Sequence, residues 1–275
     1  MSKGKFVFTV FASFLILTAF ACVSEAKTIY VPDDYARIQW AVDHASAGDT
    51  IIVRDGTYYE NLKIDKQLTI KSENGSANCI VDGGGNGDVI TLNANGVTIE
   101  GFTVRNSGSY DAGIKVVSNA NKIAYNCITN NYYGIYLYSS SNNNIYNNNA
   151  SNNDEGIYLW YSSSNKIYLN NFINNTDNVD SSASTNIWNS TEKITYTYNG
   201  NQYTSYLGNY WSDYTGSDAD RDGIGDTPYS IDSDKDNYPL MERFENYFVL
   251  PTQYGVYVCV PSCAPKIISS FPGSN

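Results

Sequence analysis

The sequence is poor in the residues that most often hold metals or carry acid–base chemistry. Its 275 residues include one histidine, His44, and two methionines. A single imidazole excludes sites that need two histidine ligands, such as the usual His-rich zinc and copper centres. His44 also lies on the polar side of a predicted helix, so we interpret it as a surface residue.

Charged side chains are scarce as well, and positive charge is the scarcer kind. Asp, Glu, Lys and Arg make up 16% of the chain, against roughly 25% in an ordinary soluble domain. The 17 Lys and Arg residues against 28 Asp and Glu give a net charge of −11. Because affinity for nucleic acid depends on clustered Lys and Arg, this balance excludes a nucleic-acid partner. The hydrophobic fraction of 42% indicates a folded chain.

Only one apolar run is long, and it lies at the start. Residues 6–21 follow Lys3 and Lys5 and precede Ser24-Glu25-Ala26. This pattern predicts a secretory signal over residues 1–26, and the run is shorter than the ~20 residues that span a bilayer. We therefore expect a secreted or cell-surface protein that does not span the membrane. A lipid anchor at Cys22 is the alternative, but the position three residues earlier lacks the usual larger aliphatic side chain.

The chain does contain an internal repeat of 22 to 24 residues. Gly-Ile pairs begin at Gly113, Gly134 and Gly156, and two sets of asparagines recur every 22 residues: Asn126, Asn148 and Asn170, and Asn130, Asn152 and Asn174. Each repeat holds short apolar runs rich in β-branched and aromatic residues, which predict strands. A unit this short buries an apolar face only by stacking on its copies.

Stacked copies predict an all-β fold, a solenoid of parallel strands that rises about 4.8 Å per coil. Asn126, Asn148 and Asn170 would then form a ladder in which each amide bonds to the next. We expect these asparagines to adopt the left-handed turn conformation at a corner of the coil. Before the repeats, a strand at 28–31 and an amphipathic helix at 35–45 would cover the open end.

Several motifs resemble those of the right-handed, single-stranded parallel β-helix superfamily, the pectate-lyase-like solenoids. They are Ile38-Gln39, Gly48-Asp49-Thr50-Ile51, Gly56-Thr57-Tyr58-Tyr59-Glu60-Asn61 and Leu68-Thr69-Ile70, followed by the Asn/Gly-Ile coils. Together with Gly208-Asn209-Tyr210-Trp211-Ser212-Asp213-Tyr214, they make the chain most similar to archaeal cell-surface proteins with NosD-type (periplasmic copper-binding) or CASH (carbohydrate-binding and sugar hydrolase) repeats. This resemblance covers about residues 28–248. It implies the fold, whereas these families hold enzymes, binding proteins and proteins of unassigned role.

The expected organisation follows from these patterns. We predict a signal peptide over 1–26, a strand and cap helix over 27–49, β-helix repeats over 50–190 and a Trp/Asp-rich closing segment over 191–248. Residues 249–275, with four prolines and no repeat, are typical of a linker. Gly56-x-Tyr58-x-Glu60 is similar to the start of pectin methylesterases, but their later signatures are missing, so we assign it to the fold.

The sharpest local motif is an acidic loop in the closing segment. Asp218, Asp220 and Asp222 alternate along the chain, Gly223 permits a sharp bend, and Asp226 follows. With the main-chain carbonyl of Ile224, these oxygens suit calcium, which takes six to eight oxygen ligands. A solvated acidic turn is the alternative. Copper, the metal in the NosD name, is not expected because the chain has one histidine, two methionines and scattered thiols.

Two further sets of residues are candidates for a glycan site. β-Helix enzymes that cleave polysaccharides use acids on neighbouring coils, and Asp111 and Asp154 stack two coils apart here with Tyr132 between them. Acids that merely solvate a glycine turn are the alternative. Outward aromatic residues on the coils suit sugar rings, whose CH faces stack on them. These are Tyr136, Tyr138, Tyr158 and Trp160.

Export also permits disulfides. Cys79 and Cys127 lie 48 residues apart, so stacking would separate them by two coils, about 9.6 Å. That distance exceeds the ~7 Å limit between the Cα atoms of a disulfide, and we predict that they do not pair. Cys259 and Cys263 could close a small loop.

The sequence favours an exported β-helix protein without catalytic activity that binds a polysaccharide or cell-envelope glycan, or has a structural or adhesive role in the cell envelope. A polysaccharide hydrolase or lyase using such acids as Asp111 and Asp154 is the alternative. Delivery of copper as an accessory protein is the second alternative.

Overall fold

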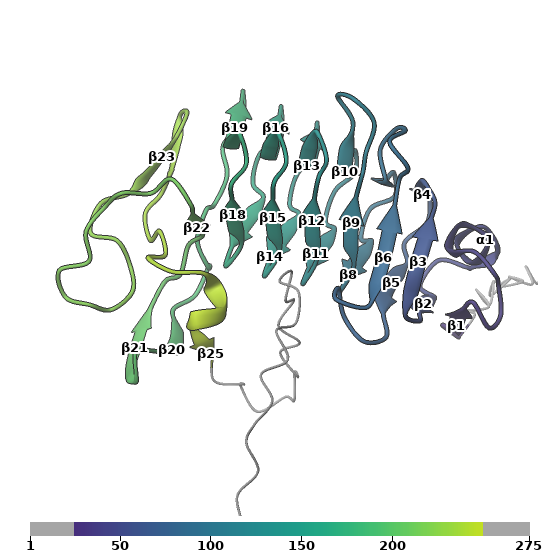
Figure 1. Cartoon of the computed structure of the whole chain (residues 1–275), viewed down its shortest axis with the longest axis horizontal. Coiled ribbons are helices and arrows are strands. Elements are labelled where there is room, and N and C mark those ends of the chain that lie inside the picture. The colour runs from purple at the N-terminus through teal and green to yellow at the C-terminus, as the bar shows by residue number, and fades with distance from the viewer. Residues whose placement is uncertain (1–24, 250–275) are drawn as a thin grey trace, which may run out of the picture.

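The chain forms a stack of coils in the computed structural model, which describes residues 25–249 (Figure 1). Three parallel sheets run along the stack, and each complete coil contributes one strand to each sheet. The first sheet contains β1 (Thr28–Val31), β2 (Thr50–Val53), β5 (Thr69–Ser72), β8 (Thr98–Glu100), β11 (Lys122–Ala124), β14 (Asn144–Tyr146) and β17 (Lys166–Tyr168). The second contains β3 (Gly56–Tyr59), β6 (Cys79–Asp82), β9 (Thr103–Arg105), β12 (Cys127–Thr129), β15 (Asn149–Ser151), β18 (Asn171–Ile173) and β22 (Tyr210–Trp211).

The third sheet, which carries the surface of most interest below, contains β4 (Leu62–Ile64), β7 (Ile90–Leu92), β10 (Ala112–Val116), β13 (Tyr133–Tyr138), β16 (Glu155–Trp160) and β19 (Asp177–Ser182). The repeated isoleucines lie in register: Ile123, Ile145 and Ile167 are partners on adjacent strands of the first sheet. All three are fully buried inside the stack. The solenoid of parallel strands predicted from the repeat, and the parallel β-helix implied by the family resemblance, are confirmed.

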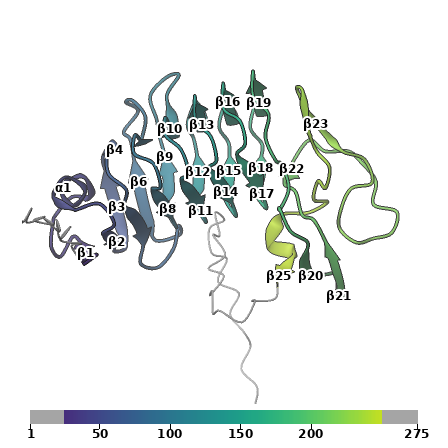
Figure 2. The ribbon, with the colours of Figure 1, turned by 180° about the vertical axis from the view of Figure 1, so that it is seen from behind.

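One end of the stack is covered by α1 (Ile38–His44), as predicted (Figures 1 and 2). Its buried side chains, Ile38, Ala41 and Val42, join the core of the solenoid. The two carboxylate oxygens of Glu60 accept the main-chain N–H groups of Ile38 and Gln39, each at 3.0 Å. Glu60 thus satisfies donors that a helix start leaves unpaired. The Gly56-x-Tyr58-x-Glu60 stretch therefore holds the cap helix in place.

The predicted asparagine ladder exists, and it is one of three. The Nδ2 of Asn126 donates to the Oδ1 of Asn148 at 3.0 Å, and Asn148 donates to Asn170 at the same distance. The main-chain N–H of each rung donates to the same oxygen of the next rung. Parallel ladders run along two other corners: Asn121, Asn143, Asn165 and Asn186, and Asn131, Asn153 and Asn175.

The expected left-handed conformation of Asn126, Asn148 and Asn170 is wrong by one residue. Positive φ angles of 59°, 54° and 54° occur at the residues just before them, Tyr125, Asn147 and Leu169. The residue in the left-handed conformation turns the chain. The next side chain then points into the coil, where its amide bonds to main-chain groups of the preceding coil and of its own coil and to the side chain of the next rung. The ladder residues are accordingly buried.

Each ladder ends on a carboxylate from the closing segment. Asn186 donates its main-chain N–H to Asp234 and Asn209, the last rung after Asn170, donates to Asp236, both at 2.7 Å. The third ladder ends through Asn178, whose Nδ2 lies 2.7 Å from the Oδ1 of Asp213. A last rung needs only an acceptor, and a carboxylate has acceptors alone. Figure 1 shows the closing segment against this end of the stack.

The closing segment has a small core of its own. It contains the antiparallel strands β20 (Ile194–Tyr198), β21 (Asn201–Ser205) and β25 (Phe248–Val249), the pair β23 (Tyr229–Ile231) and β24 (Asp234–Asp236), and the 3₁₀ helix η1 (Phe244–Asn246). The ring of Trp211 stacks on Phe172 of the last coil and on Tyr229, at centroid distances of 4.6 and 4.4 Å. Trp211 thereby joins the core of the stack to the segment that closes it.

The remaining structural predictions concern isolated residues. Cys79 is a free, buried thiol, so the predicted lack of a bridge to Cys127 is confirmed. His44 is exposed, its Nδ1 lies 2.8 Å from the main-chain oxygen of Trp40, and the surface assignment holds. Within residues 25–249, no helix has both the length and the apolar character needed to cross a bilayer. The proposed signal cleavage region, the 249–275 tail, Cys259 and Cys263 fall wholly or mainly outside the described residues.

Candidate functional site: a polar groove beside an aromatic surface

A groove of about 420 Å³ follows the corner between the second and third sheets. It crosses several coils, because equivalent positions of successive repeats line it. The lining residues are Ser107, Gly108, Ser109, Asn130, Asn131, Tyr132, Asn152, Asn153, Asp154, Asn174 and Thr176. The groove is therefore polar, and the same kinds of side chain recur along it from coil to coil.

The groove owes its repeating amides to one backbone feature. Asn130, Asn152 and Asn174 have φ angles of 56°, 56° and 52°, which turn their side chains outward while the next residue points into the coil. All three are exposed. The described residues give these side-chain amides no hydrogen-bond partner, so each offers a donor and an acceptor to a ligand. Adjacent coils lie about 4.8 Å apart.

The predicted acids Asp111 and Asp154 lie in one column with Tyr132 between them. The main-chain N–H of Tyr133 donates to the oxygen of Asp111, and Ala112 and Glu155 are the strand partners of Tyr133 on either side. Two coil spacings separate the two acids, about 9.6 Å. Asp154 lines the groove next to Tyr132, whereas Asp111 is not among the lining residues. The structure does not bring these two carboxylates together.

Aromatic rings cover the outer side of β13 and β16. We call Tyr132, Tyr133, Tyr136, Tyr138, Tyr158, Trp160 and Tyr161 the aromatic surface. Tyr136 and Tyr158 are strand partners, as are Tyr138 and Trp160. Because the ring of Tyr132 contacts that of Tyr133 at 4.7 Å and also lines the groove, the groove and the aromatic surface are continuous.

The four predicted aromatic residues play two different parts. Tyr158 stacks on Tyr133 at 5.0 Å, and Tyr136 lies 4.9 Å from Tyr158, so these two rings are partly buried against neighbours. Tyr138 and Trp160 are 46% and 39% exposed. The outer pair therefore offers ring surface to a ligand, and the inner pair supports it.

Sequence reasoning did not select Glu155, a carboxyl in an unusual environment, as a candidate. It is the strand partner of Tyr133 and of Asp177, and the atom Oε2 is buried without a hydrogen-bond partner among the described residues. Burial, together with the smaller effect of the charges of Asp180, Asp177 and Asp154, raises the pKa of Glu155 to about 7. The repeat places Glu155 in a column, but Asp177 and Asp180 follow the last regular repeat, and their proximity could not be predicted.

A raised pKa at Glu155 gives stability a defined pH dependence. The folded chain holds this proton more tightly than the unfolded chain does. Its contribution to the free energy of unfolding is therefore fully present below about pH 4.5 and is lost as pH rises through about 7. Because the carboxyl is partly exposed, we expect the free energy of unfolding to fall by about 1 kcal/mol between about pH 5 and about pH 8. Chemical unfolding across this range checks it. In Glu155→Gln this component should vanish, and an unchanged slope would contradict the assignment.

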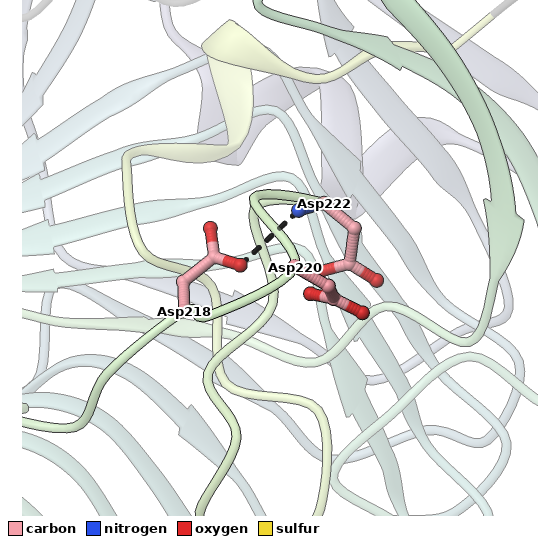
Figure 3. A group of neighbouring side chains, drawn as sticks. All are labelled: Asp218, Asp220 and Asp222. Atoms are coloured by element: carbon pink, nitrogen blue, oxygen red, sulfur yellow. Dashed lines mark hydrogen bonds between the residues drawn. The ribbon is translucent and has the colours of Figure 1, made fainter.

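The predicted calcium ligands form a compact group only in part. Asp218, Asp220 and Asp222 each place a carboxylate oxygen within 4.8 Å of the others on one turn of the loop (Figure 3). Burial raises the pKa of Asp222, and the charges of Asp220, Asp218 and Asp226 act in the same direction against the N–H of Ile224, which lowers it. A divalent cation would relieve this repulsion.

The other two predicted ligands are placed differently. Asp226 accepts hydrogen bonds from Ser217 Oγ at 2.8 Å and from the N–H of Ala219 at 3.0 Å, which closes the base of the loop. Ile224 is buried and bridges to Leu240. The loop is attached to the small core, because Tyr196 donates its hydroxyl to the main-chain oxygen of Asp222 at 2.9 Å.

Copper, which the NosD resemblance implies, does not fit the described side chains. His44 is on α1 at one end of the stack, and Met241 is in the closing segment at the other (Figure 1). Cys79 lies in the core, where burial raises the pKa of its thiol to about 12 and so opposes the thiolate form that binds metals. In the described part of the chain, the soft and imidazole ligands that copper prefers are thus kept apart.

Comparison with known proteins places the chain in a family. A relative from Methanothermus fervidus, named "Cell surface glycoprotein", is 38% identical over 91 residues, which are 32% of this chain and 15% of that protein. Among solved structures, a pectin methylesterase in complex with a hexasaccharide has a TM-score of 0.37 at 10% identity, over 75% of this chain and 94% of the other. The pectin methylesterase of Erwinia chrysanthemi has a TM-score of 0.36, also at 10% identity, over 73% and 93% of the two chains.

The family model described as "Periplasmic copper-binding protein (NosD)" matches residues 23–216. That match includes the whole stack of coils, the groove, the aromatic surface and the Gly208–Tyr214 motif. The chain therefore belongs to the NosD family.

Proposed function

We propose that this chain is an exported cell-surface protein that binds a glycan without cleaving it. The observation that carries the proposal is the groove, where unpaired amides repeat from coil to coil and continue through Tyr132 onto exposed rings. The cell-surface location is supported by the predicted signal peptide and by the name of the Methanothermus relative. In the absence of glycan binding, a structural role in the cell envelope would be the better interpretation.

The chemistry of the two surfaces suits a sugar chain. Amide groups donate and accept hydrogen bonds, as sugar hydroxyls do, and aromatic rings pack against the CH faces of sugars. Asn130, Asn152 and Asn174 present this chemistry at the spacing of the coils, so a linear polymer lying along the stack would meet the same contacts repeatedly. Tyr138 and Trp160 would hold one side of the same ligand.

Binding to a glycan array, followed by titration of the best ligand, tests the proposal. Asn130→Gly/Asn152→Gly removes two amides, and glycine tolerates the positive φ of both positions. We expect this variant and Tyr138→Ala/Trp160→Ala each to weaken binding by about tenfold or more, a loss of ~1.4 kcal/mol. Trp40→Ala, at an exposed ring on α1, is the matched control and should bind as the unmodified protein does. Equal losses in the control would contradict a site at the groove.

Cleavage of the bound glycan is the second candidate function, and Glu155 is the observation that favours it. A carboxyl with a pKa of about 7 is protonated often enough at neutral pH to donate a proton to a leaving glycosidic oxygen. Asp180, whose charge contributes to that pKa, would activate the attacking water. Release of new reducing ends from the bound glycan, abolished in Glu155→Gln with binding retained, would establish this activity. Binding without release supports the first proposal.

We also propose that Asp218, Asp220 and Asp222 bind calcium and stabilise the closing segment. At a calcium concentration about 100-fold above Kd, the melting temperature should rise by about 5–10 °C. Asp220→Asn/Asp222→Asn should remove this rise, and its stability without calcium should equal or exceed that of the unmodified protein because the repulsion is gone. An equal rise in this variant, or in Asp43→Asn on α1 alone, would show that calcium acts elsewhere.

A further inference from the structure

The aromatic surface lies in a field of negative charge. Asp154, Glu155, Asp177 and Asp180 occupy adjacent positions of β16 and β19 and of the turn before β16, beside Tyr133 and Tyr158. In the described part of the chain, Lys115 is the cation that contacts these rings, with its Nζ 5.7 Å from the centre of the Tyr136 ring. Asp88 pairs with that ammonium at 3.1 Å. Among the described residues, the aromatic surface therefore has more carboxylates than cations, and the one cation that contacts its rings is already paired with Asp88.

Glu155 shows what kind of group this surface lacks. Its Oε2 is shielded from solvent, and no donor of the described residues reaches it. A buried carboxylate without a donor is costly, so Glu155 adds to the electrostatic cost of the acids around it. An ammonium group lying against the rings would offset the mutual repulsion of these carboxylates, and it is attracted to the faces of aromatic rings.

The same charges act against acidic ligands. A sugar chain with a carboxylate on each unit would bring negative charge next to Asp154, Asp177 and Asp180 as it packed on the rings. Like charges brought together with little water between them repel strongly, and such repulsion is a common source of specificity. The hydroxyl-binding groove alone would accept either kind of polymer, so the charge of the aromatic surface decides between them.

We propose that the groove and the aromatic surface select glycans that carry free amines and reject glycans that carry carboxylates. This inference rests on the proposed glycan binding and names the class of ligand. The amide row of the groove takes the hydroxyls, the rings take the faces of the sugars, and the carboxylates of Asp154, Asp177 and Asp180 take the ammonium groups.

Three oligosaccharides of equal length test the inference with the full chain: a glucosamine oligomer, its N-acetylated counterpart and a galacturonate oligomer. Affinities are measured at about pH 6 and low ionic strength, where amines are charged and screening is weak. We expect the glucosamine oligomer to bind about tenfold or more tightly than its N-acetylated form. The galacturonate oligomer should bind more weakly than either. Added salt should narrow these differences.

Charge variants separate selectivity from binding as such. In Asp177→Asn/Asp180→Asn the preference for the amine should shrink to about twofold, whereas Asp43→Asn on the exposed side of α1 should leave it unchanged. Equal or tighter binding of galacturonate by the unmodified protein, lost in Tyr138→Ala/Trp160→Ala, would overturn the charge selection and leave the proposed function intact. Failure of all three oligomers to bind would overturn the selection of amines, and the proposed function would fall with it only if the glycan array also showed no binding.

Discussion

Replacing Asp236 by alanine is expected to lower the free energy of unfolding by about 3–5 kcal/mol, the cost of removing one partner from a buried charged network. Asp236 is fully buried and accepts hydrogen bonds from the N–H of Asn209 at 2.7 Å, from Trp211 Nε1 at 3.1 Å and from the N–H of Tyr238 at 2.9 Å. Alanine leaves all three donors without an acceptor. It also leaves the last rung of one asparagine ladder open.

Denaturant titration measures this loss, and hydrogen exchange locates it. Amides of β18 and β22 should lose protection before those of β7 and β10 if Asp236 secures the closed end. Asp236→Asn keeps one acceptor oxygen and should cost less than the alanine variant. Asp220→Asn, in calcium-free buffer, changes an exposed acid of the same segment and should shift the free energy of unfolding by less than about 0.5 kcal/mol. A similarly small effect of Asp236→Ala would show that the ladder end contributes little.

The second large effect is expected for Asn148→Ala, in the middle of a ladder. The side chain of Asn148 donates to the main-chain oxygens of Ile123 and Tyr146 and accepts from both nitrogens of Asn126. Alanine leaves these buried groups unpaired, and several such groups together cost about 3–5 kcal/mol. The loss should appear in denaturant titration as a lower midpoint with an unchanged slope.

A matched control lies four residues away. Asn152 is exposed, has no side-chain partner and has a φ of 56°, so Asn152→Gly keeps the backbone conformation. We expect it to change the free energy of unfolding by less than about 1 kcal/mol. If Asn148→Ala and Asn152→Gly have the same effect, the two rows of asparagine are not energetically distinct, and the buried ladder does not determine stability.

The fold could be predicted because the residues that form the core recur at a constant interval. Isoleucine recurs every 22 residues at 123, 145 and 167, and that interval fixes which strands become neighbours. The interval does not reveal which of two adjacent asparagines faces inward. In Asn130-Asn131 and Asn152-Asn153 the first turns the chain and lines the groove, and the second joins a ladder. Only backbone conformation separates them, since both recur with the same period.

The acidic closing segment was predicted less well for a related reason. The sequence predicts a calcium loop at 218–226, whereas the structure uses Asp213, Asp234 and Asp236 to end the three ladders. These contacts join residues that are 27 to 48 positions apart. They lie outside the repeat, so the periodicity of the sequence does not predict them. The environment of Glu155 could not be predicted for the same reason, because Asp180 approaches it from the last, irregular strand.

The two ends of each ladder form different hydrogen bonds, and this difference determines where a coil can be added to the stack. Their first rungs accept from main-chain N–H groups, as Asn126 does from Phe102 at 3.0 Å, and their last rungs donate to carboxylates. Every rung between has the same pattern on both sides. Duplication of one 22-residue unit between Asn126 and Asn170 would therefore leave both ends unchanged and lengthen the groove by about 4.8 Å. Growth by internal duplication preserves the closed ends, whereas addition of a coil at either terminus would have to rebuild them.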